Sequence, residues 1–341
     1  MLRLPPFAYL GARTVGDALK FMHDHGSDAM LVAGGTDLYP NMKRRQFEPG
    51  VLVGLRGIRE LHGISGSAES GFVIGSQTTL TRVAEHPGIC GVFPALATAA
   101  GLVSSPQLRN MGSIGGNVCV DTRCNYYNQT YQWRKAIGFC MKKYGDICLV
   151  APSSSRCWAV SSSDTAPVLW SLGARVRLHG PGGERVIPIE NLYRDDGIDY
   201  LAKRPDEILT EIVLPPVNGT RCAYLKLRRR GSFDFPVLGV AVALRIDADR
   251  VLNGRIVLGA VASQPREARD ASALLAGQRL TPELIAAVAE KASKPSKPLD
   301  NTDFTHPYRK KMTRVFVTRA LRRLAGLPDS PRNDAEMEVD R

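Results

Sequence analysis

The stretch Leu31-Val-Ala-Gly-Gly-Thr-Asp37 joins the end of an apolar run, Ala29–Val32, to a turn of small residues. Residues 38–45 continue with a helical pattern, so the stretch predicts a strand, a tight glycine turn and a helix. Such a turn lets a pyrophosphate approach backbone N–H groups and the positive end of the helix dipole. A purely structural turn explains two glycines equally well, so this motif alone does not establish a binding site.

The residues on both sides of this stretch predict an α/β unit. Thr14 and Asp17 have the spacing of a capping box, and a helix is expected over residues 14–25. Apolar runs at 51–55 and 72–75 predict further strands. Helices and strands therefore alternate on either side of the glycine turn.

A second glycine-rich loop, Met111-Gly-Ser-Ile-Gly-Gly-Asn117, has the same properties. Two such loops, about eighty residues apart, are able to hold opposite sides of one extended dinucleotide. Neither loop matches the G-x-G-x-x-G fingerprint or carries a P-loop lysine, which disfavours a Rossmann or P-loop site.

Four cysteines follow this loop within an irregular, polar stretch, residues 119–160. They are Cys124, Cys140, Cys148 and Cys157, with the spacing C-x15-C-x7-C-x8-C. In a reducing compartment, clustered thiols indicate metal or redox chemistry rather than disulfides. Both structural zinc and an iron–sulfur cluster take four thiolates, so the ligand count leaves both open. The wide spacing favours a cluster, because zinc sites generally use close cysteine pairs.

The remaining three cysteines are expected to have other roles. Cys119 lies five residues before Cys124 and is interpreted as a neighbour of the metal site rather than a ligand. Cys90 and Cys222 lie in apolar surroundings and are predicted to be inert core thiols.

Length and composition bound the class of protein. The chain has 341 residues, 44% of them hydrophobic, which is enough for more than one packed domain. Its start has no apolar core behind a basic segment, and no run approaches the roughly 18 apolar residues of a membrane helix. A soluble, cytoplasmic protein without a membrane partner is expected.

The net charge of +12 does not predict nucleic-acid binding. The basic residues form small separate groups, such as Arg228-Arg-Arg230, without interleaved aromatic residues or a known binding module. An acidic partner protein or a solvated face explains the charge better.

Residues beyond 174 predict a different arrangement. Apolar segments 175–178 and 184–188 flank Gly180-Pro-Gly-Gly183, the signal of a β-hairpin. The expected strands that follow are 208–214, 223–227, 237–246 and 251–259, and the expected helices are 266–276, 282–292 and 309–325. These strands are predicted to form one antiparallel sheet with helices, an α+β domain.

The predicted fold class is therefore α+β, in several parts. The expected parts are 1–57, 58–178 with the insertion 119–160, a C-terminal domain 184–326, and a disordered tail 327–341.

Two further charged residues are candidates for a site. Asp164 in Ser163-Asp-Thr-Ala-Pro167 is placed either to cap the following helix or to accept a hydrogen bond from a ribityl or ribose hydroxyl. Lys226 lies in an expected strand, where most lysines face water, but it is also able to set a positive charge beside a reduced flavin.

Taken together, the motifs Leu31–Asp37, Gly112–Asn117 and Ser163–Pro167 resemble those of the FAD-binding subunit of the xanthine dehydrogenase family of molybdenum enzymes. The resemblance covers about residues 5–325. Most members have no cysteine insertion, but Asp121-Thr-Arg-Cys124-Asn-Tyr-Tyr-Asn-Gln129 and the spacing after it are similar to the flavin subunit of the 4-hydroxybenzoyl-CoA reductase branch.

This resemblance implies a two-part FAD-binding domain of the PCMH type, followed by a C-terminal domain of the CO dehydrogenase flavoprotein type. FAD is expected in extended form between the two N-terminal segments, with its pyrophosphate on the two glycine loops. The implied cofactor-binding residues are Leu31, Val32, Ala33, Gly34, Gly35, Thr36, Asp37, Val103, Ser113, Ile114, Gly115, Gly116, Asn117, Asp164, Leu209 and Lys226. A 4Fe-4S cluster is implied on Cys124, Cys140, Cys148 and Cys157.

The resemblance also implies partners and an activity. The partners are a large molybdopterin subunit and a small subunit with 2Fe-2S clusters, in a dimer of heterotrimers. Electrons are expected to pass from reduced ferredoxin through this oxidoreductase subunit to molybdenum, where 4-hydroxybenzoyl-CoA loses its phenolic hydroxyl; no catalytic residue is expected in this chain. The alternatives are the FAD subunit of a molybdenum hydroxylase that oxidises an aldehyde or N-heterocycle, and a zinc-stabilised binding module without redox activity.

Overall fold

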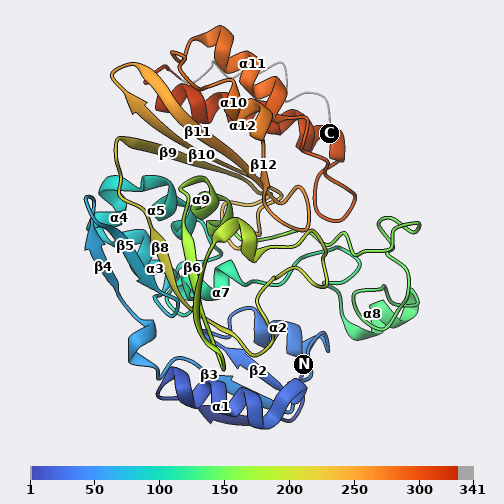
Figure 1. The fold of residues 1–341 in the computed structure, drawn as a ribbon. Coiled ribbons are helices and arrows are strands. Elements are labelled where there is room, and N and C mark those ends of the chain that lie inside the picture. Colours follow the sequence, from blue (N-terminus) through green and yellow to red (C-terminus); the bar gives the residue numbers. More distant parts are fainter. Residues whose placement is uncertain (1, 329–341) are drawn as a thin grey trace.

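The computed structural model describes residues 2–328, which form three sheets stacked from the N-terminal to the C-terminal end of the molecule (Figure 1). The predicted disordered tail falls largely outside the described residues. Within residues 2–328, no helix is both long enough and apolar enough to cross a membrane. The predicted α+β class is confirmed, since mixed α/β parts precede an antiparallel sheet covered by helices.

The N-terminal part is a parallel sheet of order β1-β3-β2 with two helices. Its elements are β1 (Ala8–Gly11), α1 (Val15–His25), the 3-10 turn η1 (Gly26–Asp28), β2 (Ala29–Val32), α2 (Leu38–Lys43) and β3 (Val51–Gly54). The capping box is present, because Thr14 Oγ1 accepts from Asp17 N and the Asp17 carboxylate accepts from Thr14 N, both at 3.0 Å. The predicted strand, glycine turn and helix are confirmed at β2 and α2.

The middle part is an antiparallel sheet of order β4-β5-β8-β6-β7, packed against short helices. Its strands are β4 (Ile64–Ser67), β5 (Gly71–Gly75), β6 (Arg175–Gly180), β7 (Gly183–Pro188) and β8 (Ile208–Leu214). Its helices are α3 (Leu80–Glu85), α4 (Pro87–Val92), α5 (Pro94–Gly101), α6 (Pro106–Arg109), α7 (Ile114–Val118) and α9 (Thr165–Ser171), with 3-10 turns η2 (Arg59–Leu61) and η3 (Ile189–Leu192). The predicted hairpin of β6 and β7 is confirmed.

Strand β8 was expected in the C-terminal sheet, and the structure corrects this. It lies between β5 and β6, with Leu214 opposite Phe72 and Ile212 opposite Val176. The apolar pattern of residues 208–214 predicted a strand correctly. It could not identify the partners, because β5 lies more than a hundred residues earlier in the chain and strand pairing leaves little local signal.

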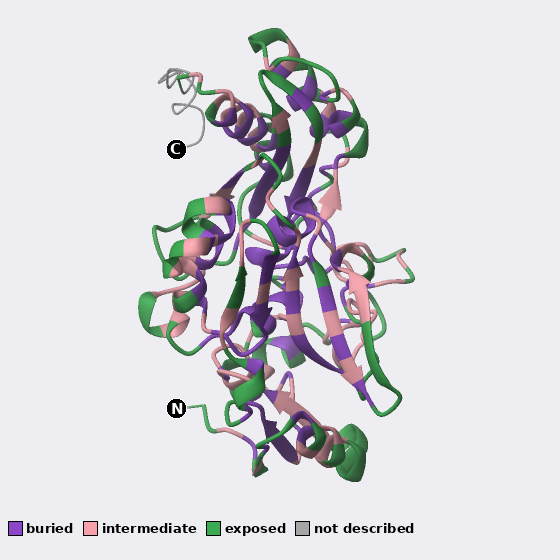
Figure 2. Cartoon of the chain, turned by 60° about the vertical axis from the view of Figure 1, so that its left-hand side comes forward, coloured by how far each residue is buried: buried purple, intermediate pink, exposed green. Residues whose placement is uncertain are grey.

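The C-terminal part is an antiparallel sheet of order β12-β11-β10-β9, covered by helices (Figure 1). Its elements are β9 (Thr220–Leu227), β10 (Leu238–Asp247), β11 (Arg250–Gly259), β12 (Arg266–Glu267), α10 (Arg269–Ala273), α11 (Pro282–Ala292) and α12 (His306–Leu324). The helix predicted over 266–276 is wrong at its start, because Arg266 and Glu267 pair with β11 before the chain turns into α10. The buried residues follow the strands and the inner faces of the helices (Figure 2).

The expected irregular stretch 119–160 projects from the side of the middle part (Figure 1). It contains one short helix, α8 (Tyr131–Ala136). Its two ends meet in an isolated antiparallel bridge, in which Arg123 N donates to Val160 O at 2.8 Å and Val160 N donates to Arg123 O at 2.7 Å. This bridge closes the segment, so the four cysteines are held in one lobe beside the sheet.

Candidate functional site

A cleft of about 830 Å³ lies between the N-terminal and middle parts. Cavities of this size accommodate cofactors and drug-sized ligands. Most of the predicted cofactor-binding residues line it: Leu31, Val32, Ala33, Gly34, Gly35, Thr36, Asp37, Val103, Ser113, Gly115, Gly116, Asn117 and Leu209. The structure thus brings both glycine loops and a residue of β8 to one site.

The two glycine loops touch each other at Gly34. A Cβ on Gly34 would lie 1.9 Å from the backbone oxygen of Met111, a distance that no side chain tolerates. Gly35 has φ +70° and a Cβ there would meet the ring of Tyr39 at 2.2 Å. Glycine at both positions is therefore required by the packing of this turn.

The second loop is held in a similar way. Ser113 precedes α7, and its Oγ accepts from Gly116 N at 3.1 Å. A Cβ on Gly115 would lie 2.7 Å from atoms of Ser76 in the strand-end segment after β5. The loop therefore packs tightly on the middle sheet and presents its backbone to the cleft.

Asn117 lies at a buried polar junction at the end of this loop. Its Oδ1 accepts from Ser163 Oγ at 2.9 Å, from Thr165 Oγ1 at 2.7 Å and from Thr165 N at 3.2 Å. The oxygen thus accepts three hydrogen bonds, while the side-chain NH2 group donates none to residues 2–328 and is the end of the amide left for a ligand. This orientation leaves a donor suited to an anionic group in the cleft.

Three predicted residues do not line the cleft in this structure. Ile114 is a core residue with no exposed surface. Asp164 and Lys226 form a buried ion pair at 2.9 Å, supported by hydrogen bonds from Tyr224 to Asp164 and from Lys226 to Leu102 O. Burial raises the pKa of Asp164 and lowers the pKa of Lys226, and their mutual attraction opposes both shifts. Their contact with a cofactor stays a prediction.

Several residues of the cleft wall were not predicted. Asp121, Tyr200, Lys203 and Phe235 line the cleft from the insertion, the loop before β8 and the loop before β10. The two loops that carry Tyr200, Lys203 and Phe235 have no motif, and only the fold brings them to the glycine turns. Asp121 carried the one usable signal, since it follows the second glycine loop by four residues.

Arg123 connects the cysteine-bearing lobe to the first glycine loop. Its guanidinium group forms an ion pair with Asp37, donates to Asn41 Oδ1 at 3.3 Å and lies 4.4 Å from the ring centre of Phe235. Burial lowers the pKa of Arg123 to about 10. Arg123 immediately precedes Cys124, so the cleft wall and the cysteine lobe share this anchor.

The four predicted cysteine ligands, Cys124, Cys140, Cys148 and Cys157, line one small cavity in the insertion. The cavity has a volume of only about 10 Å³, so a metal group would have to displace the side chains around it. Within residues 2–328, no three His, Cys, Asp or Glu side chains are grouped closely enough to hold a metal ion as they stand. The donor set fits an iron–sulfur cluster in number and type, but the present arrangement of the thiols does not by itself show a metal site.

These thiols are buried. Burial raises the pKa of Cys124 to about 12 and that of Cys157 to about 11. The other three thiols around the cavity each raise the pKa of Cys124 further through their charge. A cation that joins the four sulfurs would stabilise them as thiolates.

The other cysteines lie elsewhere. Cys119 lines the cleft rather than the cysteine cavity, which agrees with its interpretation as a neighbour. Cys222 is buried, as predicted, but Cys90 is exposed. The prediction for Cys90 was wrong because the short helix α4 turns this residue outward, where its thiol donates to Ala84 O.

Comparison with known families assigns both halves of the chain. A model described as the FAD binding domain in molybdopterin dehydrogenase matches residues 5–217. A model described as the CO dehydrogenase flavoprotein C-terminal domain matches residues 222–324. The boundary between the two matches follows β8 and precedes most of β9, in agreement with the sheet to which each strand belongs.

Individual relatives agree. The carbon monoxide dehydrogenase medium chain of Hydrogenophaga pseudoflava is 29% identical over 318 residues, which cover 93% of this chain and 96% of the relative. The aldehyde oxidoreductase FAD-binding subunit PaoB of Escherichia coli strain K12 is 30% identical over 262 residues, covering 72% of this chain and 79% of that subunit.

The fold is also shared with solved structures. A structure of the Hydrogenophaga pseudoflava carbon monoxide dehydrogenase superposes with a TM-score of 0.77 at 29% identity, covering 94% of this chain and 97% of the other. Reconstituted CO dehydrogenase from Oligotropha carboxidovorans gives a TM-score of 0.78 at 27% identity, covering 96% and 100%. The chain therefore belongs to the family with the FAD binding domain of molybdopterin dehydrogenases and is an FAD-binding subunit of a molybdenum hydroxylase family enzyme.

Proposed function

We propose that this chain is the electron-transfer subunit of a molybdenum enzyme that reductively dehydroxylates 4-hydroxybenzoyl-CoA to benzoyl-CoA. In this proposal it holds FAD in the cleft and a 4Fe-4S cluster on Cys124, Cys140, Cys148 and Cys157. The observation that carries it is the convergence of these four thiols, spread over 34 residues of an irregular lobe, on one cavity next to the cleft wall. Reduced ferredoxin is the proposed electron donor.

The cleft supports FAD binding through its own residues. The backbone of the first glycine loop and the side-chain NH2 group of Asn117 suit the pyrophosphate of an extended dinucleotide. The N–H groups of Gly115, Gly116 and Asn117 already donate to Ser76 and Ser113, so they hold the second loop in place rather than bind the phosphates. Apolar side chains such as Leu31, Val103 and Leu209 exclude water from the same space. Bound FAD supplies one- and two-electron exchange, while the protein sets its position and surroundings.

The cysteine lobe supports the second redox site. Its four thiols match the ligand set of a 4Fe-4S cluster, and Ala159 N donates to Cys157 Sγ at 3.4 Å, the type of hydrogen bond that tunes such centres. An additional one-electron site beside the flavin suits a route that brings electrons in from reduced ferredoxin.

The relatives' names support an assembly with partner subunits. The carbon monoxide dehydrogenase relative is a medium chain, and the Escherichia coli relative is an FAD-binding subunit. We infer that this chain assembles with a large molybdopterin subunit, where the substrate reacts, and a small 2Fe-2S subunit, as a dimer of heterotrimers.

A second candidate function is favoured by other relatives. The nicotinate dehydrogenase FAD-subunit of Eubacterium barkeri is 26% identical over 285 residues, and PaoB belongs to an aldehyde oxidoreductase. In that case the same subunit serves a hydroxylase of an N-heterocycle or aldehyde, and electrons leave through FAD.

The cofactor content tests the first half of the proposal. We expect anoxically purified chain to contain about one FAD and about four irons, with an EPR signal of a reduced cluster after dithionite. The Cys124→Ser variant should lose iron, while Cys90→Ser, which changes the exposed thiol outside the lobe, should retain it. Zinc without iron under anoxia would make the lobe structural and favour the hydroxylase function.

An assay of the assembled enzyme tests the second half. With its partner subunits and reduced ferredoxin, it should convert 4-hydroxybenzoyl-CoA to benzoyl-CoA. Oxidation of an aldehyde or N-heterocycle with no reduction of the thioester would establish the alternative. Ferredoxin-dependent turnover is expected to fall steeply with salt, because the chain has a net charge of +12 and ferredoxins are acidic.

A further inference from the structure

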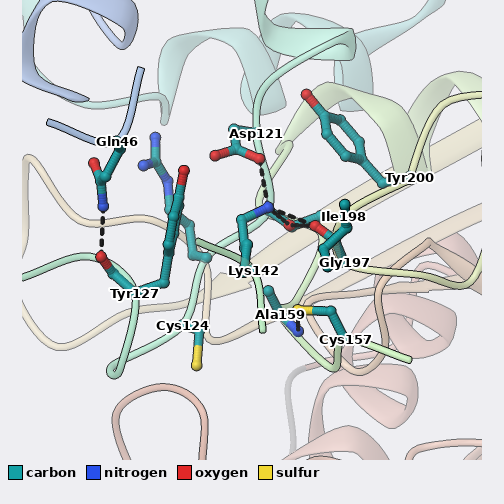
Figure 3. Close-up of polar contacts among 12 residues, drawn as sticks. Gln46, Asp121, Cys124, Tyr127, Lys142, Cys157, Ala159, Gly197, Ile198 and Tyr200 are labelled. Atoms are coloured by element: carbon teal, nitrogen blue, oxygen red, sulfur yellow. Dashed lines mark hydrogen bonds and ion pairs between the residues drawn. The ribbon is translucent and has the colours of Figure 1, made fainter. Parts of the chain in front are cut away.

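A buried ion pair lies between the cleft and the cysteine cavity. Lys142 Nζ lies 2.8 Å from Asp121 Oδ1, and the two side chains are only 5% and 7% exposed. Asp121 lines the cleft, whereas Lys142 lines the cysteine cavity. In Figure 3, Asp121 lies on one side of Lys142 Nζ and the sulfurs of Cys124 and Cys157 lie on the other.

The ammonium group of Lys142 is fixed in place. It donates to Asp121 Oδ1, to Thr122 Oγ1 at 2.7 Å and to Gly197 O, so each of its three N–H groups has an acceptor. The rings of Tyr127 and Tyr200 flank it, with centres 4.8 and 5.6 Å from Nζ. Lys142 therefore acts as a stationary charge rather than a mobile surface lysine.

The same contacts connect Lys142 to a proposed ligand. Gly197 N donates to Cys157 O at 2.9 Å, and a Cβ on Gly197 would lie 2.7 Å from Cys157 Sγ. Gly197 therefore contacts both the ammonium group of Lys142 and the residue that carries the thiol, so the two charged sites lie close together.

Lys142 contacts one oxygen of the Asp121 carboxylate, Oδ1. The other oxygen, Oδ2, is buried and has no closely aligned donor within the described part of the chain; the neighbouring polar group is the hydroxyl of Tyr127. Since Asp121 lines the cleft, its carboxylate places negative charge close to whatever occupies the cleft.

We propose that Asp121 and Lys142 form an oriented pair of fixed charges that separates the reduction potentials of the two redox sites. The positive end favours the reduced, more negative state of a metal centre on the cysteines, and so raises its potential. The negative end disfavours added charge on a flavin in the cleft, and so lowers its potential. This inference rests on the proposed function, because it assumes a flavin and a metal centre at these two sites.

The size of the effect follows from burial. Charges in the protein interior interact far more strongly than in water, and cluster potentials respond to nearby charge and hydrogen bonding. Both residues act only through their charge, which changes the reduction potentials of the two sites, so neither is a catalytic residue. Together they make electron transfer from the flavin to the metal centre more favourable than it would be without them.

Potentiometric titration of the anoxic holoprotein tests the proposal, with EPR for the metal centre and absorbance for the flavin. Lys142→Met should lower the midpoint reduction potential of the metal centre. We expect the equilibrium constant for electron transfer from the flavin to the metal centre to fall about tenfold. Lys143→Met removes the same charge from the next residue, whose side chain stacks on Tyr144 instead, and should change it little. Asp121→Asn should raise the midpoint reduction potential of the flavin. Asp146→Asn, at an exposed residue, should leave it unchanged.

Equal shifts in Lys142→Met and Lys143→Met, or an unchanged flavin midpoint in Asp121→Asn, would overturn the inference. The double variant Asp121→Asn/Lys142→Met removes both charges of the buried pair and leaves no unpaired buried charge. It can therefore be measured even if one of the single variants does not fold. It should still lower the metal midpoint and raise the flavin midpoint. If the wild-type chain carries FAD but no iron, the cluster proposal fails, and the flavin midpoint of Asp121→Asn alone decides the inference.

Discussion

The side chains of Asn117 and Thr165 are joined by a hydrogen bond of 2.7 Å, in which the Thr165 hydroxyl donates to Asn117 Oδ1. The bond ties the second glycine loop to the start of α9, 48 residues later. Together with the donors of Ser163 and Thr165 N, it fixes which end of the Asn117 amide faces the cleft. A residue of the glycine motif is thus oriented by a second motif that lies far away in the sequence.

This relationship predicts the effect of Asn117→Asp. The carboxylate keeps the shape and the acceptors for Ser163 and Thr165, but it replaces the NH2 donor by negative charge next to the proposed pyrophosphate site. We expect FAD affinity to fall roughly 10- to 100-fold, about 1.4 to 2.7 kcal/mol, with little loss of folding stability. Fluorescence titration of the apoprotein with FAD measures this. Asn110→Asp, at an exposed residue outside the cleft lining, serves as the control, and equal loss in both variants would contradict the assignment.

The contact between the two glycine loops predicts the effect of Gly34→Ala. The added Cβ collides with the backbone of Met111, so the loops must separate. We expect purified Gly34→Ala to contain little FAD and to lose at least about 2 kcal/mol of unfolding free energy. The ratio of flavin to protein absorbance and urea denaturation measure the two effects.

A matched control exists in the same half of the chain. Gly91→Ala adds a methyl group in α4 where no atom lies within 4 Å. It should retain FAD and stability, since alanine favours a helix over glycine. Normal FAD content in Gly34→Ala would show that the two loops do not need their present contact.

Local patterns predicted much of this fold. The capping box of Thr14 and Asp17, the apolar strand Ala29–Val32 and the hairpin glycines at 180–183 each carry their signal within a few residues. The glycine loops were predicted for the same reason, since small residues at a strand-to-helix turn have a local cause.

The features missed by the sequence are long-range. Strand β8 pairs with β5, and Asp121 meets Lys142 across 21 residues of irregular chain. Asp164 and Lys226, the two residues of the buried pair, were identified separately, but their contact depends on β9 reaching the N-terminal end of α9. Pairing of this kind depends on tertiary packing, which no local periodicity encodes.

The ion pair between Arg123 and Asp37 predicts that the cysteine lobe and the cleft are coupled. Arg123→Met keeps an apolar side chain over Phe235 but leaves the Asp37 carboxylate without its cation. We expect FAD affinity to fall about tenfold and the lobe to become more open to proteolysis. Limited trypsin digestion with mass spectrometry, alongside FAD titration, checks both effects. Arg229→Met, which removes an exposed ion pair with Asp303, should alter neither.

Glu207 predicts a pH-dependent contribution to stability near the cleft. Its carboxylate accepts from Arg185 Nε at 2.7 Å, from Arg185 Nη2 at 2.9 Å and from Arg204 N at 2.7 Å, and the side chain is 1% exposed. These contacts hold the loop that brings Lys203 and Asp206 to the cleft. The hydrogen bond from Arg185 is the main cause that lowers the pKa of Glu207 to about 2.

Since the pKa of glutamate in the unfolded chain is about 4.3, this contribution is complete above that pH and is lost as the pH falls through about 2. Glu207→Gln should therefore cost about 2 kcal/mol of unfolding free energy near pH 7, and the difference from wild type should shrink between about pH 4 and 2. Urea denaturation across this range measures it. Glu184→Gln, in a more exposed pair with Arg177, should cost under about 1 kcal/mol. A wild-type advantage over Glu207→Gln that stayed constant down to pH 2 would show that the carboxylate charge does not hold this loop.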